Sequence, residues 1–276
     1  MKKKYGIIGN PLSHSLSPFL HNYWFKKYNI DAEYSLFDIK ENEISNIIKK
    51  IKKKEISGIN VTLPYKQKVI QYLSKIINDA KSTNSVNTIY TDNEGNVVGD
   101  NTDVYGLQAG YFKEIFEENQ SKQKVLIMGA GGVSPSVIHA LIKSGISKIH
   151  LANRTNEKAI FLKKMFPIIS IENWPEINTI TQEFDVIINA TSIGLKNKIE
   201  ETGIIFKNFK SSLKFIDTIY NPVETNTIKY LKSKNIKTFN GLDMFIYQGQ
   251  KSFYFWHKIN PEIDNELIEL LKDKIK

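Results

Sequence analysis

The sequence predicts a two-domain α/β protein, in which an N-terminal open α/β unit is followed by a second α/β unit and by C-terminal helices that pack back on the first. Three observations lead to this prediction. The 276 residues exceed one average domain and fall short of three. Short apolar runs alternate with segments of helical period almost from end to end. A glycine-rich turn follows one of these runs near the middle of the chain, where a new unit begins.

The first half of the chain is predicted to contain three strands that alternate with three helices. The apolar runs have the length of buried strands, and the segments between them have the spacing of amphipathic helices. The strands are expected at residues 5–8, 33–38 and 58–62, and the helices at residues 18–28, 41–53 and 66–75. Two further runs, 86–91 and 96–99, flank turn-forming residues and predict a hairpin at the edge of the sheet.

The second half begins after the polar stretch 117–123 and repeats the same alternation. Strands are expected at residues 124–128, 148–152, 185–188 and 214–219, and helices at residues 134–144 and 157–166. The last two segments, 242–258 and 261–275, are predicted to be helices rich in apolar and aromatic positions. They have no strand partners of their own, so we expect them to pack back on an α/β unit.

The composition excludes several classes of protein. Hydrophobic residues make up 41% of the chain and charged residues 24%, which is typical of globular proteins and not of disordered or fibrous ones. The absence of cysteine excludes disulfides, thiolate metal sites and a cysteine nucleophile, and it fits a reducing compartment. No apolar run approaches the length of about 20 residues that spans a bilayer. We therefore expect a soluble, cytoplasmic protein with no membrane partner.

The net charge of +9 raises the question of a nucleic-acid partner. The densest run of lysines, within residues 49–54, ends a predicted helix, where cations interact favourably with the helix dipole. No stacking aromatic residues or groove-binding motif accompany it, so we expect a solvated helix end and no nucleic acid. The five histidines show no ligand spacing with acidic residues, and we expect no metal site.

The glycine-rich turn predicts a dinucleotide-binding site of the Rossmann type. Gly129-Ala130-Gly131-Gly132-Val133 connects an apolar strand with a helix. A turn of this kind lets backbone N–H groups approach a pyrophosphate, and the dipole of the following helix adds attraction for the anion. The motif departs from G-x-G-x-x-G at Ser134, and a tight turn without a ligand is the alternative interpretation.

The end of the next strand favours NADP over NAD. An NAD site places an acidic residue about 20 residues after the glycine turn, on the ribose 2′-hydroxyl, whereas an NADP site needs positive charge for the 2′-phosphate. Here residues 148–152 are followed by Asn153-Arg154-Thr155, with Lys158 one helical turn later and no acidic residue before Glu157. Arg154 is the only arginine of the chain, and its guanidinium suits a phosphate. An ordinary surface cation is the alternative.

Polar clusters in the first half predict a pocket for a polyhydroxylated small molecule. They are the runs 9–18, 60–66, 87–88 and 100–103, and three of them follow strands, where open α/β sheets bind ligands. They supply hydroxyls, amides, one lysine and a carboxylate. Lys66 follows a strand and a proline and could exchange a proton with a substrate, supported by an aspartate. Ser17, taken alone, could merely cap a helix.

Together these motifs resemble the shikimate dehydrogenases, and the resemblance covers nearly the whole chain. It rests in the first half on the runs 9–18, 21–22, 60–66, 86–88 and 101–103. In the second half it rests on residues 129–132, 153–155 and 189–194, then on Asp217, Tyr220, Pro222 and Thr225, and near the end on Gly241, Met244, Gln248, Phe253 and Trp256.

The resemblance implies a substrate domain, residues 1–103 completed by 241–276, and a Rossmann NADP-binding domain, residues 104–240, with hydride transfer in a cleft between them. It implies the reversible reduction of 3-dehydroshikimate to shikimate by NADPH, on the route to chorismate and the aromatic amino acids. The partner is then a small molecule, and the chain would be a monomer or a homodimer.

Position by position, the resemblance implies the following site residues. Lys66 and Asp103 would be the catalytic pair. The substrate would be bound by Ser15, Ser17, Asn60, Thr62, Asn87, Tyr220 and Gln248. NADP(H) would be bound by Gly129, Ala130, Gly131, Gly132, Val133, Asn153, Arg154, Thr155, Lys158, Thr191, Thr218 and Gly241.

Two alternatives stay open at this point. A quinate/shikimate dehydrogenase shares the fold and the Lys66–Asp103 pair, although the two serines and the Asn-Arg-Thr run favour shikimate with NADP. A non-catalytic NADP-binding sensor would keep the glycine turn and Arg154 but would not need Lys66 and Asp103.

Overall fold

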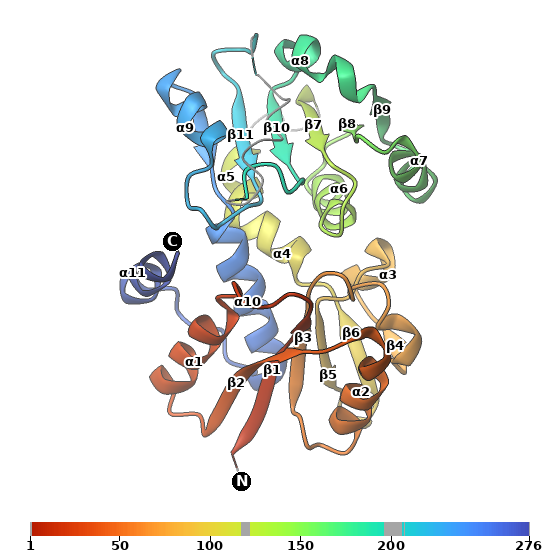
Figure 1. The fold of residues 1–276 in the computed structure, drawn as a ribbon, viewed down its shortest axis with the longest axis vertical. Coiled ribbons are helices and arrows are strands. Elements are labelled where there is room, and N and C mark those ends of the chain that lie inside the picture. Colours follow the sequence, from red (N-terminus) through yellow and green to blue (C-terminus); the bar gives the residue numbers. More distant parts are fainter. Residues whose placement is uncertain (1, 117–121, 196–205, 207, 276) are drawn as a thin grey trace. The chain divides into compact units, whose positions relative to one another are not determined.

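The computed structural model describes residues 2–116, 122–195, 206 and 208–275, and these residues form two compact units (Figure 1). The first unit comprises Met1–Gly106 and Ile246–Lys274. The second unit comprises Leu107–Phe245 and Ile275–Lys276. The chain therefore passes from one unit to the other after Gly106, after Phe245 and after Lys274, and the long helix α10 (Leu242–His257) begins in the second unit and contributes most of its length to the first.

The first unit contains a mixed six-stranded sheet in the order β2-β1-β3-β5-β6-β4. Strands β1 (Lys3–Gly9), β2 (Ala32–Asp38) and β3 (Gly58–Val61) are parallel, and the hairpin β5 (Thr88–Thr91) and β6 (Val97–Asp100) joins β3 antiparallel. The short β4 (Lys75–Ile76) pairs with β6. The helices of this unit are α1 (Ser17–Lys27), α2 (Ile44–Lys52), α3 (Asp79–Thr83), α4 (Asp103–Leu107), whose last residue falls in the second unit, and α11 (Asn265–Lys274), with most of α10.

Two details of this sheet differ from the sequence prediction. The expected helix at 66–75 is wrong, because only a short 3-10 turn, Ile70–Tyr72, forms there before β4. The N–H groups of Ser74 and Ile77 donate to backbone carbonyls of β6, so pairing with the sheet replaces a helix. The hairpin is correct, but β4 covers its outer strand, and the hairpin is therefore not at the edge.

The core of the first unit follows from the sequence pattern. In α2 the isoleucines at positions 44, 47, 48 and 51 recur at helical spacing, and all are buried against the sheet. The C-terminal helices cover other parts of the unit, as predicted. Phe253 of α10 packs edge-on against Trp24 of α1 at 5.5 Å, and the Trp24 indole N–H donates to the carbonyl of Glu262 before α11.

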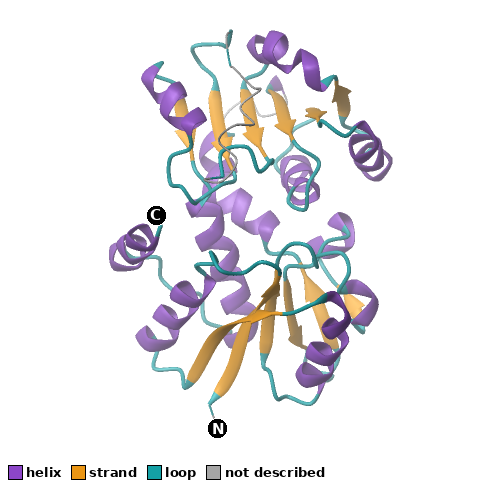
Figure 2. Ribbon diagram, in the orientation of Figure 1, coloured by secondary structure: helices purple, strands orange, loops and turns teal. Residues whose placement is uncertain are grey.

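The second unit contains an entirely parallel six-stranded sheet (Figure 2). Its order is β12-β11-β10-β7-β8-β9, which is the doubly wound order of a dinucleotide-binding fold. The strands are β7 (Lys124–Met128), β8 (Lys148–Ala152), β9 (Ser170–Glu172), β10 (Val186–Asn189), β11 (Lys214–Asp217) and β12 (Lys237–Phe239). The helices are α5 (Lys113–Ile115), α6 (Ser134–Lys143), α7 (Asn156–Met165), α8 (Ile177–Ile180) and α9 (Asn226–Ser233).

Strands β7 and β8 have the predicted bounds, whereas β9, β12 and α9 were not predicted. The central strands are buried on both faces and give continuous apolar runs, which are easy to detect. The two edge strands are only three residues long. Among the described helices, none has the length and apolarity to cross a membrane.

Candidate active site

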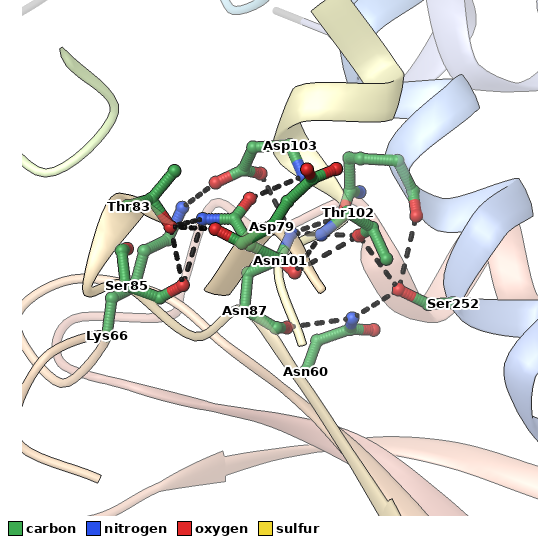
Figure 3. A network of polar contacts seen from close by, with 11 residues as sticks. Asn60, Lys66, Asp79, Thr83, Ser85, Asn87, Asn101, Thr102, Asp103 and Ser252 are labelled. Carbon is green, nitrogen blue, oxygen red and sulfur yellow. Dashed lines mark hydrogen bonds and ion pairs between the residues drawn. The ribbon is translucent and has the colours of Figure 1, made fainter. Parts of the chain in front are cut away.

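The first unit holds a shielded ion pair between Lys66 and Asp103 (Figure 3). Lys66 Nζ lies 2.6 Å from Asp103 Oδ2, and the two side chains are 13% and 6% exposed. The turn after β3 carries Lys66, and its carbonyl accepts the N–H of Val86. Asp103 begins α4, and its N–H donates to the side chain of Asn101. The sequence prediction that a lysine and an aspartate meet here therefore agrees with the geometry.

Asn87 holds the other oxygen of the Asp103 carboxylate. Its Nδ2 donates to Asp103 Oδ1 at 2.8 Å and to Thr102 Oγ1 at 2.9 Å. Its Oδ1 accepts the backbone N–H of Thr102 at 2.7 Å. A backbone N–H can only donate, so this bond fixes the amide with its NH₂ group toward the carboxylate. Both carboxylate oxygens thus have a partner, which is the condition for keeping an ion pair away from water.

Two more predicted residues join this network. Asn60, at the end of β3, is buried; its Nδ2 donates to the Asn87 carbonyl at 3.1 Å, and its Oδ1 accepts the Tyr34 hydroxyl at 2.8 Å. Gln248 of α10 places its Oε1 3.4 Å from Asn87 Nδ2. Residues far apart in sequence therefore meet at one end of the sheet.

The predicted hydroxyl groups follow β1 and β3. Ser15 Oγ donates to Ser17 Oγ at 3.2 Å in the segment between β1 and α1. Ser17 is the first residue of α1 and makes no capping bond, so the alternative role as a helix cap does not apply. Thr62 donates its N–H to Ile8 of β1, which keeps the ends of the two neighbouring strands together. Carboxyl ends of parallel strands are where open sheets bind ligands.

Several residues of the network carried no predicted role. Tyr34, Thr102 and Ser252 hydrogen-bond to predicted residues, and Asn101 connects Asp103 to Thr83 and Ser85. One signal was available for Ser252, because it lies four residues after Gln248 and hence on the same face of α10. Asn101 and Thr102 lie in the run 101–103 that carries the resemblance, whereas Tyr34 meets the network only through contacts between distant segments.

In the second unit, the glycine turn is tight and closely packed. Gly129 has φ +106°, and a Cβ there would lie 2.8 Å from the carbonyl oxygen of Ala190. Ser134 accepts the N–H of Gly131 and donates to the carbonyl of Gly129, both at 2.9 Å. The departure from the motif at Ser134 therefore closes the turn, and the turn leads into the N-terminus of α6 through Gly132 and Val133.

The predicted 2′-phosphate residues follow β8. Asn153 accepts the N–H of Ala130 at 2.9 Å and donates to the carbonyl of Thr155 at 2.6 Å, so it links the glycine turn to this segment. Arg154, Thr155 and Lys158 are exposed. Two exposed cationic residues thus belong to the segment that Asn153 links to the turn.

The remaining predicted residues lie after β10, after β11 and beside β12. The N–H and hydroxyl of Thr191 donate to Asn189 Oδ1, and the hydroxyl of Thr218 donates to the Asn189 carbonyl. Gly241 donates its N–H to the Ile219 carbonyl. Tyr220 also belongs to this unit, where its ring packs against that of Phe245 at 4.8 Å.

Asp217 was part of the resemblance but had no predicted role, and it organises these loops. Its carboxylate accepts from Asn189 Nδ2 at 3.0 Å, from the Ile219 N–H at 3.1 Å and from the Thr225 hydroxyl at 2.9 Å. Burial raises the pKa of Asp217 to about 6. One side chain therefore joins the ends of β10 and β11 and the N-cap of α9.

The second unit has a doubly wound sheet with a glycine turn, and cationic residues follow its second strand. The first unit has a shielded lysine–aspartate pair among amides and hydroxyls. Together these features define an NADP-dependent oxidoreductase. The chain belongs to the shikimate dehydrogenase family. Residues 7–89 match the shikimate dehydrogenase substrate binding domain, and residues 111–238 match the shikimate / quinate 5-dehydrogenase domain. The predicted family and fold class are thereby confirmed.

Relatives support the same assignment. The chain is 49% identical over 271 residues to the shikimate dehydrogenase (NADP(+)) of Pelagibacter ubique, covering 98% of this chain and 99% of the relative. The crystal structure of shikimate dehydrogenase from Aquifex aeolicus is similar with a TM-score of 0.82 and 33% identity, over 97% of this chain and 96% of that one. That of Thermus thermophilus, in complex with NADP(H) and shikimate, is similar with a TM-score of 0.84 and 26% identity, over 99% of both chains. The predicted preference for NADP agrees with the printed names of the Pelagibacter ubique and Thermus thermophilus relatives.

Proposed function

We propose that Lys66 and Asp103 transfer the proton in a reversible, NADPH-dependent reduction of 3-dehydroshikimate to shikimate. The observation that supports this most is the 2.6 Å ion pair, whose two side chains are almost closed to solvent. In the reductive direction the Lys66 ammonium donates a proton to the carbonyl oxygen, and in the oxidative direction the amine accepts it from the hydroxyl. Asp103 orients Lys66 and, held by Asn87, keeps a fixed position.

Apart from Tyr220, which belongs to the second unit, the hydroxyl and amide groups that would bind the substrate lie at the same end of the first sheet. Ser15 and Ser17 would bind the carboxylate, and the remaining oxygens would be contacted by Asn60, Thr62, Asn87, Tyr220 and Gln248. The clustering of three of these amides around the ion pair supports this assignment. Neutral donors and acceptors in this number suit a molecule with several hydroxyls.

The residues of the second unit fit NADP(H), which supplies the hydride when bound. Gly129 leaves no room for a side chain, and its turn opens onto the N-terminus of α6, as a pyrophosphate requires. The pyrophosphate would be held by Gly129, Ala130, Gly131, Gly132 and Val133, the 2′-phosphate by Asn153, Arg154, Thr155 and Lys158, and the rest of the cofactor by Thr191, Thr218 and Gly241.

We further propose that residues 1–103 with 241–276 form the substrate domain and residues 104–240 the cofactor domain. The two matched family domains, 7–89 and 111–238, support this division. We also propose a cytoplasmic location, which the cysteine-free composition supports, and a monomer or a homodimer, which sedimentation would distinguish.

The test is the absorbance of the reduced nicotinamide with shikimate or quinate against NADP or NAD, in four combinations. We expect turnover with shikimate and NADP, and a loss of about 10²- to 10⁴-fold in kcat for Lys66→Ala. Lys68→Ala is the matched control, because Lys68 is an exposed lysine of the same segment that pairs with Glu41. Turnover with quinate or NAD would correct the specificity. NADPH binding without any turnover would favour the sensor function.

A further inference from the structure

The side chain of Ser252 is fully buried and belongs to the hydrogen-bond network around the proposed catalytic pair. Its Oγ has three partners from three parts of the first unit: Asn60 Nδ2 at 2.9 Å, Thr102 Oγ1 at 3.2 Å and the Gln248 carbonyl at 3.1 Å (Figure 3). One hydroxyl thus joins β3, the segment that leads into α4, and α10. None of the roles assigned above uses it.

Hydrogen-bond accounting gives these contacts a direction. The Gln248 carbonyl can only accept and the Asn60 amide NH₂ can only donate. The single proton of Ser252 therefore goes to Gln248, one turn back in the helix, and its two lone pairs accept from Asn60 and Thr102. With its proton directed to Ser252, Thr102 Oγ1 accepts from Asn87 Nδ2, and the other hydrogen of that NH₂ group points to Asp103 Oδ1.

We infer that Ser252 is a positioning residue, which fixes the hydroxyl of Thr102, through it the amide of Asn87, and through Asn87 the carboxylate that holds Lys66. This inference rests on the proposed function, in which Lys66 and Asp103 transfer the proton. Thr102 and Asn87, which connect Ser252 to Asp103, are both buried. A lost hydrogen bond among them is therefore not replaced by water without a cost in free energy.

Removing the Ser252 hydroxyl disturbs this order at its far end. In Ser252→Ala one hydrogen of Asn60 and the hydroxyl of Thr102 lose their acceptor. In the parent chain the Thr102 hydroxyl already lies 3.1 Å from a second acceptor, Asn87 Oδ1, which also accepts the Thr102 N–H, and in the variant this is the acceptor that remains. The Thr102 hydroxyl then turns toward Asn87, and the Asn87 NH₂ group loses its acceptor on Thr102, so that one of its hydrogens is left with only the distant Gln248 Oε1, at 3.4 Å. Asp103 is held less firmly, while Ser15 and Ser17 keep their places.

The experiment measures kcat and KM for shikimate in Ser252→Ala, Thr102→Val and the double variant. We expect kcat to fall roughly tenfold in Ser252→Ala with KM changed less than threefold. The double variant is expected to be no slower than the slower single variant, because both remove the same connection. Thr102→Ser, which keeps the hydroxyl, is expected to retain the kcat that Thr102→Val loses.

Gln250→Met is the matched control for stability. Gln250 lies on the same helix and is buried, but its amide donates to the Pro261 carbonyl, outside this connection. We expect a lower melting temperature with unchanged kcat. A wild-type kcat in Ser252→Ala, or additive losses of kcat free energy in the double variant, would overturn the inference. If Lys66→Ala is inactive in the same assays, the proposed function still stands. Full activity of Lys66→Ala would instead refute the proposed function itself.

Discussion

The burial of His21 predicts that the first unit loses stability in mild acid. His21 lies in α1, fully buried, and its ring stacks on that of Tyr34 at 4.5 Å, with Trp24 and Trp256 around it. Burial lowers the pKa of His21 to about 3, with His257 acting in the same direction, and the side chain of Asn60 offsets only part of this. The folded chain therefore keeps the imidazole neutral, whereas the unfolded chain protonates it below its ordinary pKa of 6.5.

The magnitude follows from proton linkage. Between pH 6.5 and pH 3 the unfolded state binds the proton and the folded state does not, so the free energy of unfolding falls as the pH is lowered. From pH 7 to pH 5 the loss is about 2 kcal/mol. It does not depend on the depressed value, provided that this stays well below 5. The pKa of His257 is lowered to about 4 and adds a loss of the same sign.

The assay compares His21→Phe with the parent chain by urea unfolding at pH 7 and pH 5. Both carry Trp174→Phe, so that fluorescence reports on Trp24 and Trp256, the other two of the three tryptophans, which lie in the first unit. We expect the parent to lose about 2 kcal/mol more than the variant. Any packing cost of the phenyl ring is the same at both pH values and cancels. Equal losses in the two proteins would refute the reasoning.

Three further predictions concern the second unit. Burial raises the pKa of Asp217 from 3.8 to about 6, so between these pH values the folded state binds more protons than the unfolded state. The free energy of unfolding of this unit therefore falls as the pH rises from 3.8 to 6, by up to about 3 kcal/mol. Asp217→Asn should remove this pH dependence in urea unfolding followed at Trp174. Gly129→Ala should lower the free energy of unfolding by at least about 2 kcal/mol and weaken NADPH binding, because Gly129 has φ +106° and its Cβ would meet the Ala190 carbonyl. Gly131→Ala is the control and should melt at the temperature of the parent, because its Cβ would meet nothing closer than 3.7 Å. Arg154→Ala should weaken NADPH binding by roughly 10- to 100-fold in titrations and leave NADH nearly unchanged; equal losses would exclude a 2′-phosphate contact.

The sequence predicted the elements whose signal is local. The strands β7 and β8 are short apolar runs buried on both faces, and the glycine turn between β7 and α6 has its own signature. The segment 66–75 misled because its residues have helical spacing, while the backbone at its end, Ser74 and Lys75, pairs with β6, a strand that comes more than twenty residues later. Pairing of this kind is decided by tertiary structure and leaves little trace in local propensity.

The site divides in the same way. Lys66 and Asp103 could be predicted because each follows a strand and because the resemblance names them. Part of their supporting shell could not, since Tyr34 and Ser252 belong to no motif, and Thr102 lies in the run 101–103 but had no assigned role. Polar residues buried in a core must find partners, but a sequence does not say which partners meet.

The chemical character of this shell suits its proposed task. Lys66 changes its own charge when it donates or accepts the proton. A titrating side chain among the residues that support it could take up or release a proton in response. The chain Ser252–Thr102–Asn87 consists of hydroxyls and an amide, which keep their protons throughout the physiological range. These fixed dipoles orient the Asp103 carboxylate without exchanging protons with it. The charge change then stays between Lys66 and the substrate, which is why neutral residues, rather than further acids or histidines, are the appropriate supports here.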